Sequence, residues 1–290
     1  WLNLKSKIFE SEISLENTVL SQKLLDALPK AERRKEALYW KAGTLLEVGD
    51  VEAAAQAYAE IRDYADVSEV LKKDKKLNSA VKDVVTAPYR KVGGIVTLGT
   101  YEQDNDTGDG PEPIEWIVLD TDGKKSLLIS RYGMDAKPYN EKNTDITWEK
   151  CTLRNWLNKD FLEMAFTKDE QRGILTTKVD NGKKQGNSSW NTNGGKNTQD
   201  KVFLLSYAEA GKYFGSNSAR AVKATEYAKE NGAAVNSSNG NSWWWLRSPG
   251  NNQNNATNVN NDGSRLSGGV FDASYVVRPA FWLNLESGIF

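Results

Sequence analysis

The chain has 290 residues, with 38 Lys and Arg against 39 Asp and Glu, a single Cys, ten Trp and no His. A net charge of −1 argues against a nucleic-acid partner, because phosphate binding needs a surplus of basic side chains. One Cys excludes an internal disulfide and a multi-cysteine zinc site. The absence of His removes the commonest general base and metal ligand, so the composition favours binding over catalysis.

The first and last nine residues are nearly the same. WLNLKSKIF at 1–9 and WLNLESGIF at 282–290 share seven identities. We therefore expect residues 1–9 to be the end of a preceding copy of the C-terminal domain in a tandemly repeated parent protein. The alternatives are coincidence or duplication of a short piece.

Residues 10–85 are predicted to form a tetratricopeptide-like helical unit. Apolar residues recur at helical spacing over 38–46 and again over 51–59, and Gly49–Asp50 separates the two runs. Asp66 is expected to cap a third helix. A single unit of this kind cannot bury its own face, so we expect it to pack on neighbouring repeats of the same chain or to act as a spacer.

After Pro88 the pattern changes to short strands and short helices. Runs of β-branched and aromatic residues predict strands, and apolar residues at helical spacing predict helices between them. The predicted strands are 95–101, 114–119, 126–130, 202–206, 243–246 and 276–283, and the predicted helices are 152–157, 161–166 and 208–214.

Residues 248–275 are predicted to form a long ordered loop. Seven of the twelve residues at 251–262 are Asn, and Pro and Gly accompany them, which argues against a helix or a central strand. Aromatic residues at 243–245 and 281–282 flank the segment and indicate a rigid frame at both of its ends. The composition of the segment is similar to that of an antibody paratope, with Asn and Ser for hydrogen bonds and Tyr and Phe for rigid contact area.

The sequence closely resembles a known group of proteins in this region. WWWLRSPGNNQNNATNVNNDGS followed by VVRPAFWLNL is similar to the variable region of variable proteins from diversity-generating retroelements. LGTYEQDND, PIEWIVLD, LLISRYGMDAKPYN, TWEKCTLRNWLN and DKVFLLSYAEA resemble a bacterial family of uncharacterised function. The resemblance covers about 94–285. It implies an α+β chain with a C-type-lectin-like (formylglycine-generating-enzyme-like) variable domain at 90–290.

The resemblance also implies how the Asn-rich segment arises. In such systems template adenines are copied with errors, and Asn codons carry adenine at both selecting positions. Surviving Asn should then alternate with unrelated residues. The resemblance implies variable, ligand-binding positions at Asn251, Asn252, Asn254, Asn255, Asn258, Asn260, Arg265, Leu266, Ser267, Phe271, Asp272, Ala273, Ser274 and Tyr275.

The flanking strands are expected to form the scaffold. Trp243, Trp244 and Trp245 should alternate between the two faces of a strand, so at least one is expected to face the binding side. The alternative is that all three belong to the core. Arg247 and Arg278 are predicted to be structural, paired with buried carboxylates or main-chain carbonyls.

The predicted function is ligand binding through 251–275, with no catalysis and no cofactor. The expected partner is a protein or surface ligand, and a bacterial or phage surface is favoured as the location. One alternative is a non-diversified carbohydrate- or peptide-binding lectin-like domain of a bacterial surface protein. Another is a purely structural repeat module.

Metal binding and catalysis elsewhere have weaker support. Asp104, Asp106 and Asp109 fail the spacing of a calcium loop and are expected to lie in a solvated hairpin loop. Calcium held by 260–262 would lack the usual Glu-Pro-Asn triplet, so no metal is predicted. Cys151 is predicted to be a buried small residue, because no His can activate it.

Overall fold

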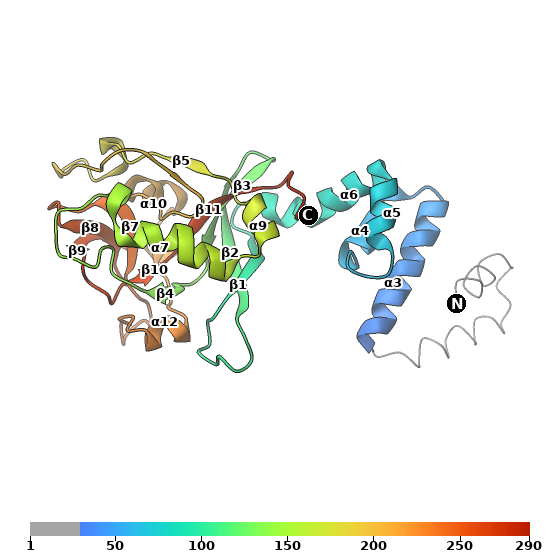
Figure 1. Ribbon diagram of the computed structural model, residues 1–290, viewed down its shortest axis with the longest axis horizontal. Helices are drawn as coiled ribbons and strands as arrows, with labels where there is room; N and C mark the ends of the chain where they lie inside the picture. Colours follow the sequence, from blue (N-terminus) through green and yellow to red (C-terminus); the bar gives the residue numbers. More distant parts are fainter. Residues whose placement is uncertain (1–29) are drawn as a thin grey trace. The chain divides into compact units, whose positions relative to one another are not determined.

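The computed structural model describes residues 30–290, and the chain divides into two compact units between Ala87 and Pro88 (Figure 1). The predicted repeat at 1–9 and the beginning of the predicted helical unit lie outside the described residues. Within 30–290 the helices are too short or too polar to cross a membrane.

The first unit is helical. Gly49, at φ +81°, allows the tight turn after the first helix, and Asp50 caps the second by accepting the N–H of Ala53. Asp66 is the N-cap residue of the third helix, as predicted, but its carboxylate accepts the Tyr39 hydroxyl at 2.6 Å and no helix N–H. The helices are α3 (Lys30–Glu47), α4 (Val51–Glu60), α5 (Val67–Lys73) and α6 (Lys75–Thr86).

The second unit contains two larger sheets and one two-stranded sheet, so the predicted α+β class is confirmed. The antiparallel four-stranded sheet has the order β1-β2-β3-β11, and the mainly antiparallel five-stranded sheet has the order β4-β10-β7-β8-β9. The strands are β1 (Ile95–Tyr101), β2 (Glu112–Thr121), β3 (Lys125–Ser130), β4 (Asp135–Ala136), β5 (Thr177–Val179), β6 (Thr198–Asp200), β7 (Trp244–Pro249), β8 (Asn255–Val259), β9 (Arg265–Gly269), β10 (Val276–Val277) and β11 (Ala280–Asn284).

Short helices surround these sheets. The two helices predicted at 152–157 and 161–166 form one continuous helical segment, because a π-helical turn, η3, joins α7 to α8. The helices are α7 (Thr152–Trp156), η3 (Leu157–Phe161), α8 (Leu162–Ala165), α9 (Lys168–Gly173), α10 (Tyr207–Tyr213), α11 (Asn217–Arg220) and α12 (Glu226–Glu230), with single turns η1 (Ala87–Arg90), η2 (Trp148–Lys150) and η4 (Lys183–Gln185).

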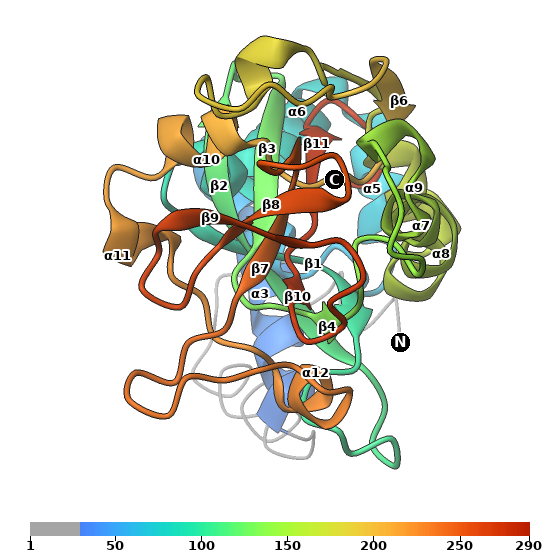
Figure 2. The same ribbon diagram turned by 90° about the vertical axis from the view of Figure 1, so that its left-hand side faces the viewer.

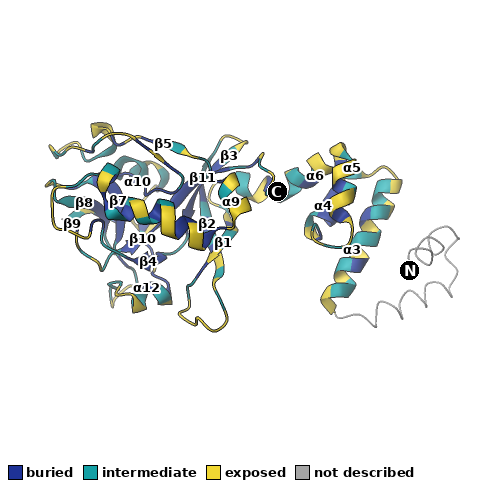
Figure 3. Cartoon of the chain, in the orientation of Figure 1, coloured by how far each residue is buried: buried dark blue, intermediate teal, exposed yellow. Residues whose placement is uncertain are grey.

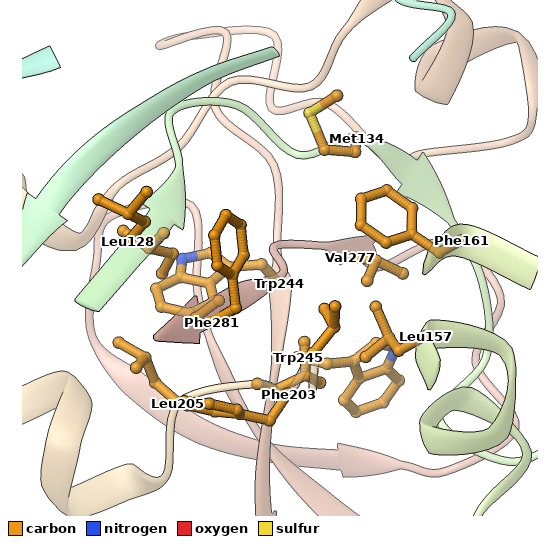
Figure 4. Close-up of a cluster of buried hydrophobic side chains, with 14 of the residues drawn as sticks. Leu128, Met134, Leu157, Phe161, Phe203, Leu205, Trp244, Trp245, Val277 and Phe281 are labelled. Atoms are coloured by element: carbon orange, nitrogen blue, oxygen red, sulfur yellow. The ribbon is translucent and has the colours of Figure 1, made fainter. Parts of the chain in front are cut away.

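Aromatic side chains from several elements fill the core of the second unit (Figure 4). Trp244 and Trp245 are adjacent on β7, and both are completely buried. Neighbouring residues of a strand point to opposite faces, so β7 is covered on both sides. This strand is the rigid frame on which the Asn-rich segment is built.

Two predicted strands are wrong in detail. Residues 202–206 form no regular strand, and only Phe203 makes an isolated bridge, to Ala280. The strand predicted at 276–283 is two strands in different sheets. Pro279, which has no N–H to donate, and Arg278 separate β10 from β11 and carry the chain from the five-stranded to the four-stranded sheet.

The prediction that 248–275 contains no central strand is also wrong. Residues 255–259 and 265–269 form the antiparallel hairpin β8–β9, and β8 pairs with β7 on its other side. Asn is unfavourable in strands on average, but the pairing with a fully buried neighbour outweighs this preference.

Candidate ligand-binding surface

The register of β7, β8 and β9 brings one row of side chains across the sheet. Trp245 lies opposite Asn258, and Asn258 lies opposite Leu266. Directly opposed residues in antiparallel strands share a face. Along this row the exposed fraction rises from 0% at Trp245 through 1% at Asn258 to 46% at Leu266, and Figure 3 shows the change from buried β7 to the partly exposed β9. The sheet therefore passes from core to surface within three strands.

The turn between β8 and β9 is fixed by α11. Gly263 has φ +85°, and a Cβ there would lie 1.7 Å from the carbonyl oxygen of Asn217. Arg220 donates from Nε to the carbonyl oxygen of Gly263 at 2.8 Å. Only glycine permits both this backbone conformation and this close approach.

The connection between β7 and β8 is held by amide and hydroxyl side chains. The Asn251 N–H donates to Ser267 Oγ at 3.0 Å, and Ser267 Oγ donates back to Asn251 Oδ1 at 2.8 Å. Asn255 donates to the same Oδ1 at 2.9 Å. These predicted variable residues are thus linked to one another across the hairpin.

Gln253 anchors the same connection, and the sequence reasoning missed it. Its Nε2 donates to the carbonyl oxygens of Ile146 and Asn193, and its Oε1 accepts the Asn193 N–H at 2.9 Å. It is the one Gln within the Asn-rich run. This break in the run of Asn residues is the sequence feature that could have indicated an anchoring role for Gln253.

The structure brings all fourteen predicted variable residues to β8, β9 and their flanking turns, but it does not expose them equally. The exposed residues are Asn251, Asn252, Leu266, Phe271 and Ala273. The half-buried residues are Asn254, Asn255, Asn260, Arg265, Ser267, Asp272, Ser274 and Tyr275.

Asn258 is the exception, and its predicted display to solvent is wrong. It lies on the inner strand β8 between Trp245 and Leu266, so its neighbours cover it. Within residues 30–290 its Nδ2 has no hydrogen-bond partner. Gly268 packs against it, since a Cβ at Gly268 would lie 3.0 Å from that nitrogen.

Arg265 is held by α10. Its guanidinium carbon lies 4.0 Å from the centre of the Tyr207 ring, and Nη1 donates to the Tyr207 carbonyl oxygen. Gly211 provides the space, because a Cβ there would lie 2.5 Å from Nη1. In this arrangement Arg265 fixes β9 to α10.

Tyr275 covers Trp245, at the buried end of the row Trp245, Asn258 and Leu266. Its ring lies 4.5 Å from that of Trp245 between centres, and burial, followed by the charge of Asp272, raises the pKa of its hydroxyl. Trp245 therefore lies on the side of the sheet that carries Leu266, but it is completely buried there and belongs to the core. Trp243 is half-buried.

The two scaffold arginines are buried, and both use main-chain carbonyl oxygens as predicted. Arg247 donates to the carbonyl oxygens of Leu204 and Asp180 and pairs with Glu209. Arg278 donates from Nε to Ser130 O at 2.9 Å and lies over the rings of Trp244 and Phe214. Burial lowers the pKa of Arg278 to about 9.

A polar pocket of about 560 Å³ lies beside the β8–β9 turn. Its wall of amides is preorganised, because Asn239 and Asn241 both donate to the carbonyl oxygen of Asn261. The lining residues are Arg131, Tyr132, Ser218, Ala221, Val222, Lys223, Asn239, Asn241, Asn261 and Asp262.

The predicted solvated loop lies between β1 and β2. Asp104, Asp106 and Asp109 are exposed there. Among residues 30–290 one group of three carboxylates, those of Glu102, Asp104 and Glu112, has oxygen atoms within 4.8 Å of one another. Glu112 accepts the Gln103 N–H at 2.6 Å, so this cluster also holds the loop together.

Cys151 is buried, as predicted. It lies at the start of α7 and accepts the N–H of Arg154. Burial raises the pKa of its thiol to about 12, so it is not a nucleophile at neutral pH.

The fold and this surface together define an α+β domain that carries a β-hairpin on a frame of buried Trp and Arg residues. Residues 123–285 match the family model described as a domain of unknown function, DUF6273. The chain belongs to this family. No curated protein and no solved structure matches the chain.

Proposed function

We propose that residues 88–290 form a C-type-lectin-like ligand-recognition domain whose segment 251–275 is diversified by a retroelement. The observation that carries the proposal is the rise in exposure from Trp245 through Asn258 to Leu266. Exposed side chains can be replaced at little cost in unfolding free energy, whereas buried ones cannot. A surface of this kind can vary while its frame stays constant.

The chemistry of the exposed positions supports a protein or surface ligand. Leu266 and Phe271 leave 46% and 54% of their area exposed on or beside β9. Apolar side chains surrounded by polar ones are typical of the centre of a protein interface. Asn251 and Asn252 supply adaptable hydrogen-bonding groups in the β7–β8 connection, at the same end of the hairpin as Phe271.

The genetic code supports the same set of positions. Leu, Phe and Ala are all reached from an Asn codon by changing only its first two bases, which are both adenine. Leu266, Phe271 and Ala273 are exposed, so these replacements would be compatible with folding. Asn258 is buried and is left out of the proposed variable set.

Sequencing of gene copies and of a nearby template repeat tests the diversification. We expect differences only at template adenines, in codons of exposed positions such as 251, 252, 266, 271 and 273. Codons 244, 245, 247 and 258 should be constant. Differences at other bases, or changes concentrated in the codons of buried residues, would contradict the proposal.

A display library tests whether the exposed residues can vary while the buried frame stays folded. Residues 251, 252, 266, 271 and 273 are randomised in the intact chain, and the library is selected on an immobilised protein such as lysozyme. We expect folded binders to emerge. A matched library randomised at Trp244, Trp245 and Asn258 should yield few folded members, because these side chains are buried.

The polar pocket favours a second candidate function, the binding of a small polar ligand such as a saccharide. Tyr132, Asn241 and Lys223 provide an aromatic ring, an amide and an exposed ammonium within one concavity. A glycan array tests this candidate, with Asn241→Ala as the variant expected to lose binding. A chelator would separate calcium-dependent from calcium-independent binding.

A further inference from the structure

β9 forms one edge of the five-stranded sheet. The strand order ends with β9, and no described strand pairs with its outer side (Figure 2). An open edge presents unpaired N–H and C=O groups and is a template for a further strand.

The register identifies which main-chain groups point outward. Asn260 N donates to Ser264 O at 2.8 Å, and Val270 N donates to Asn254 O at 3.1 Å. Hydrogen-bonded pairs alternate along an antiparallel ladder, so Leu266 and Gly268 turn their main-chain groups toward β8. The outward groups are those of Arg265, Ser267 and Gly269.

These outward groups are mostly unused. The Gly269 carbonyl oxygen accepts the Asp272 N–H at 3.1 Å, while the N–H and C=O of Arg265 and Ser267 have no main-chain partner among residues 30–290. The side chains of Arg265 and Ser267 are bound to Tyr207 and Asn251. Their positions on the face of the sheet leave the strand edge open.

The two ends of β9 carry matching carboxylate turns. Asp262 Oδ1 accepts the N–H and hydroxyl of Ser264, and Asp272 Oδ1 accepts those of Ser274. In each case Oδ2 accepts no hydrogen bond from residues 30–290, so negative charge lies at both ends of the open edge. Two copies of β9 paired antiparallel about Ser267 would bring Asp262 near Asp272 of the other copy, which disfavours a second copy as the occupant.

We infer that β9 binds an extended segment of a partner protein by strand addition, with basic residues at the ends of that segment. Main-chain hydrogen bonds to Arg265, Ser267 and Gly269 supply affinity that does not depend on sequence. Leu266 and Phe271 beside the edge then select the partner. The inference rests on the proposed function, since it assigns a binding mode to the same surface, and it explains how recognition persists while side chains vary.

A peptide library tests the inference. Phage-displayed random peptides of about ten residues, long enough to extend past both ends of β9, are selected on the intact chain. We expect enriched peptides with basic ends. Ser267→Pro removes an outward N–H at an edge position that tolerates proline, so it should weaken their binding at least about tenfold.

Ser267→Ala is the matched control, because it removes the hydroxyl but keeps the N–H; binding should change less than about threefold. Asp262→Asn with Asp272→Asn should weaken binding and remove its salt dependence. If Ser267→Pro unfolds the domain, amide hydrogen exchange in the unaltered chain tests strand addition instead. The amides of Arg265 and Ser267 must then exchange more slowly with peptide bound.

Failure to enrich any peptide, equal binding by Ser267→Pro in a folded domain, or a β9-paired dimer in sedimentation would each overturn strand addition. Loss of binding in Leu266→Ala with Phe271→Ala but not in Ser267→Pro would leave the proposed recognition surface intact and refute only the binding mode. Loss in none of these variants would refute both.

Discussion

Arg247 and Arg278 differ in how their buried charges are satisfied. Arg247 makes several hydrogen bonds and an ion pair with Glu209, whose side chain is 27% exposed. Arg278 makes one hydrogen bond through Nε, and its Nη1 has no partner among residues 30–290. A buried charge without full pairing adds little stability.

Replacement by Met should therefore have unequal effects. We expect Arg247→Met to lower the unfolding free energy by about 2–4 kcal/mol, because it removes the ion pair with Glu209 and the hydrogen bonds to two buried carbonyl oxygens. Arg278→Met should change it by about 1 kcal/mol or less, because an apolar side chain of similar length can pack against the rings of Trp244 and Phe214. Urea denaturation measures both, and equal losses would contradict this account.

Cys151 gives a prediction about pH. Burial raises its thiol pKa from 9.0 to about 12, so the unfolded chain loses this proton first as the pH rises. The thiol's contribution to stability is complete below pH 9 and is lost between about 9 and 12. We expect Cys151→Ala to lessen the alkaline loss of stability in pH-dependent urea melts.

The burial of Cys151 can also be tested by alkylation. Iodoacetamide should label Cys151 at pH 8 only in denaturant. Rapid labelling of the folded chain would contradict the burial of the thiol.

At the scale of elements, the β8–β9 hairpin depends on its turn. Gly263 and Gly240 both have positive φ, at +85° and +72°, but only Gly263 packs against another backbone. We expect Gly263→Ala to lower the unfolding free energy by about 2 kcal/mol more than Gly240→Ala does. The two variants share the conformational strain, so their difference isolates the contact with Asn217. Similar urea midpoints would show that the turn adjusts freely.

The sequence predicted many elements but not how they pair. Strand β1 is found with the predicted bounds, because its own pattern of side chains sufficed. Strands β8 and β9 were missed, since Asn and Gly disfavour strands locally and only the neighbouring β7 stabilises them. The division of 276–283 between two sheets was missed for a similar reason: the break at Pro279 is local, but the partners on each side are distant in sequence.

At the scale of the whole chain, each unit has its own buried core. Leu77, Val81 and Tyr58 belong to the core of the helical unit, and Trp116, Trp244 and Phe281 belong to the core of the second unit. A compact unit with its own core can fold alone.

We therefore expect a fragment of residues 88–290 to fold by itself. It should keep the near-ultraviolet circular dichroism of its buried Trp residues and melt cooperatively. The intact chain is the control. Loss of the near-ultraviolet signal with retained secondary structure would mean that the core needs the helical unit.

The sequence by itself determined the composition of this protein's frame and surface: Trp and Arg in the flanking strands, Asn and Ser between them. It also determined the α+β class, because hydrophobic periodicity is local. Only the tertiary structure decided which of the Asn-rich positions are exposed. Burial at Asn258 and the anchoring of Arg265 come from Trp245, Tyr275 and Tyr207, which lie nearby only after the chain has folded.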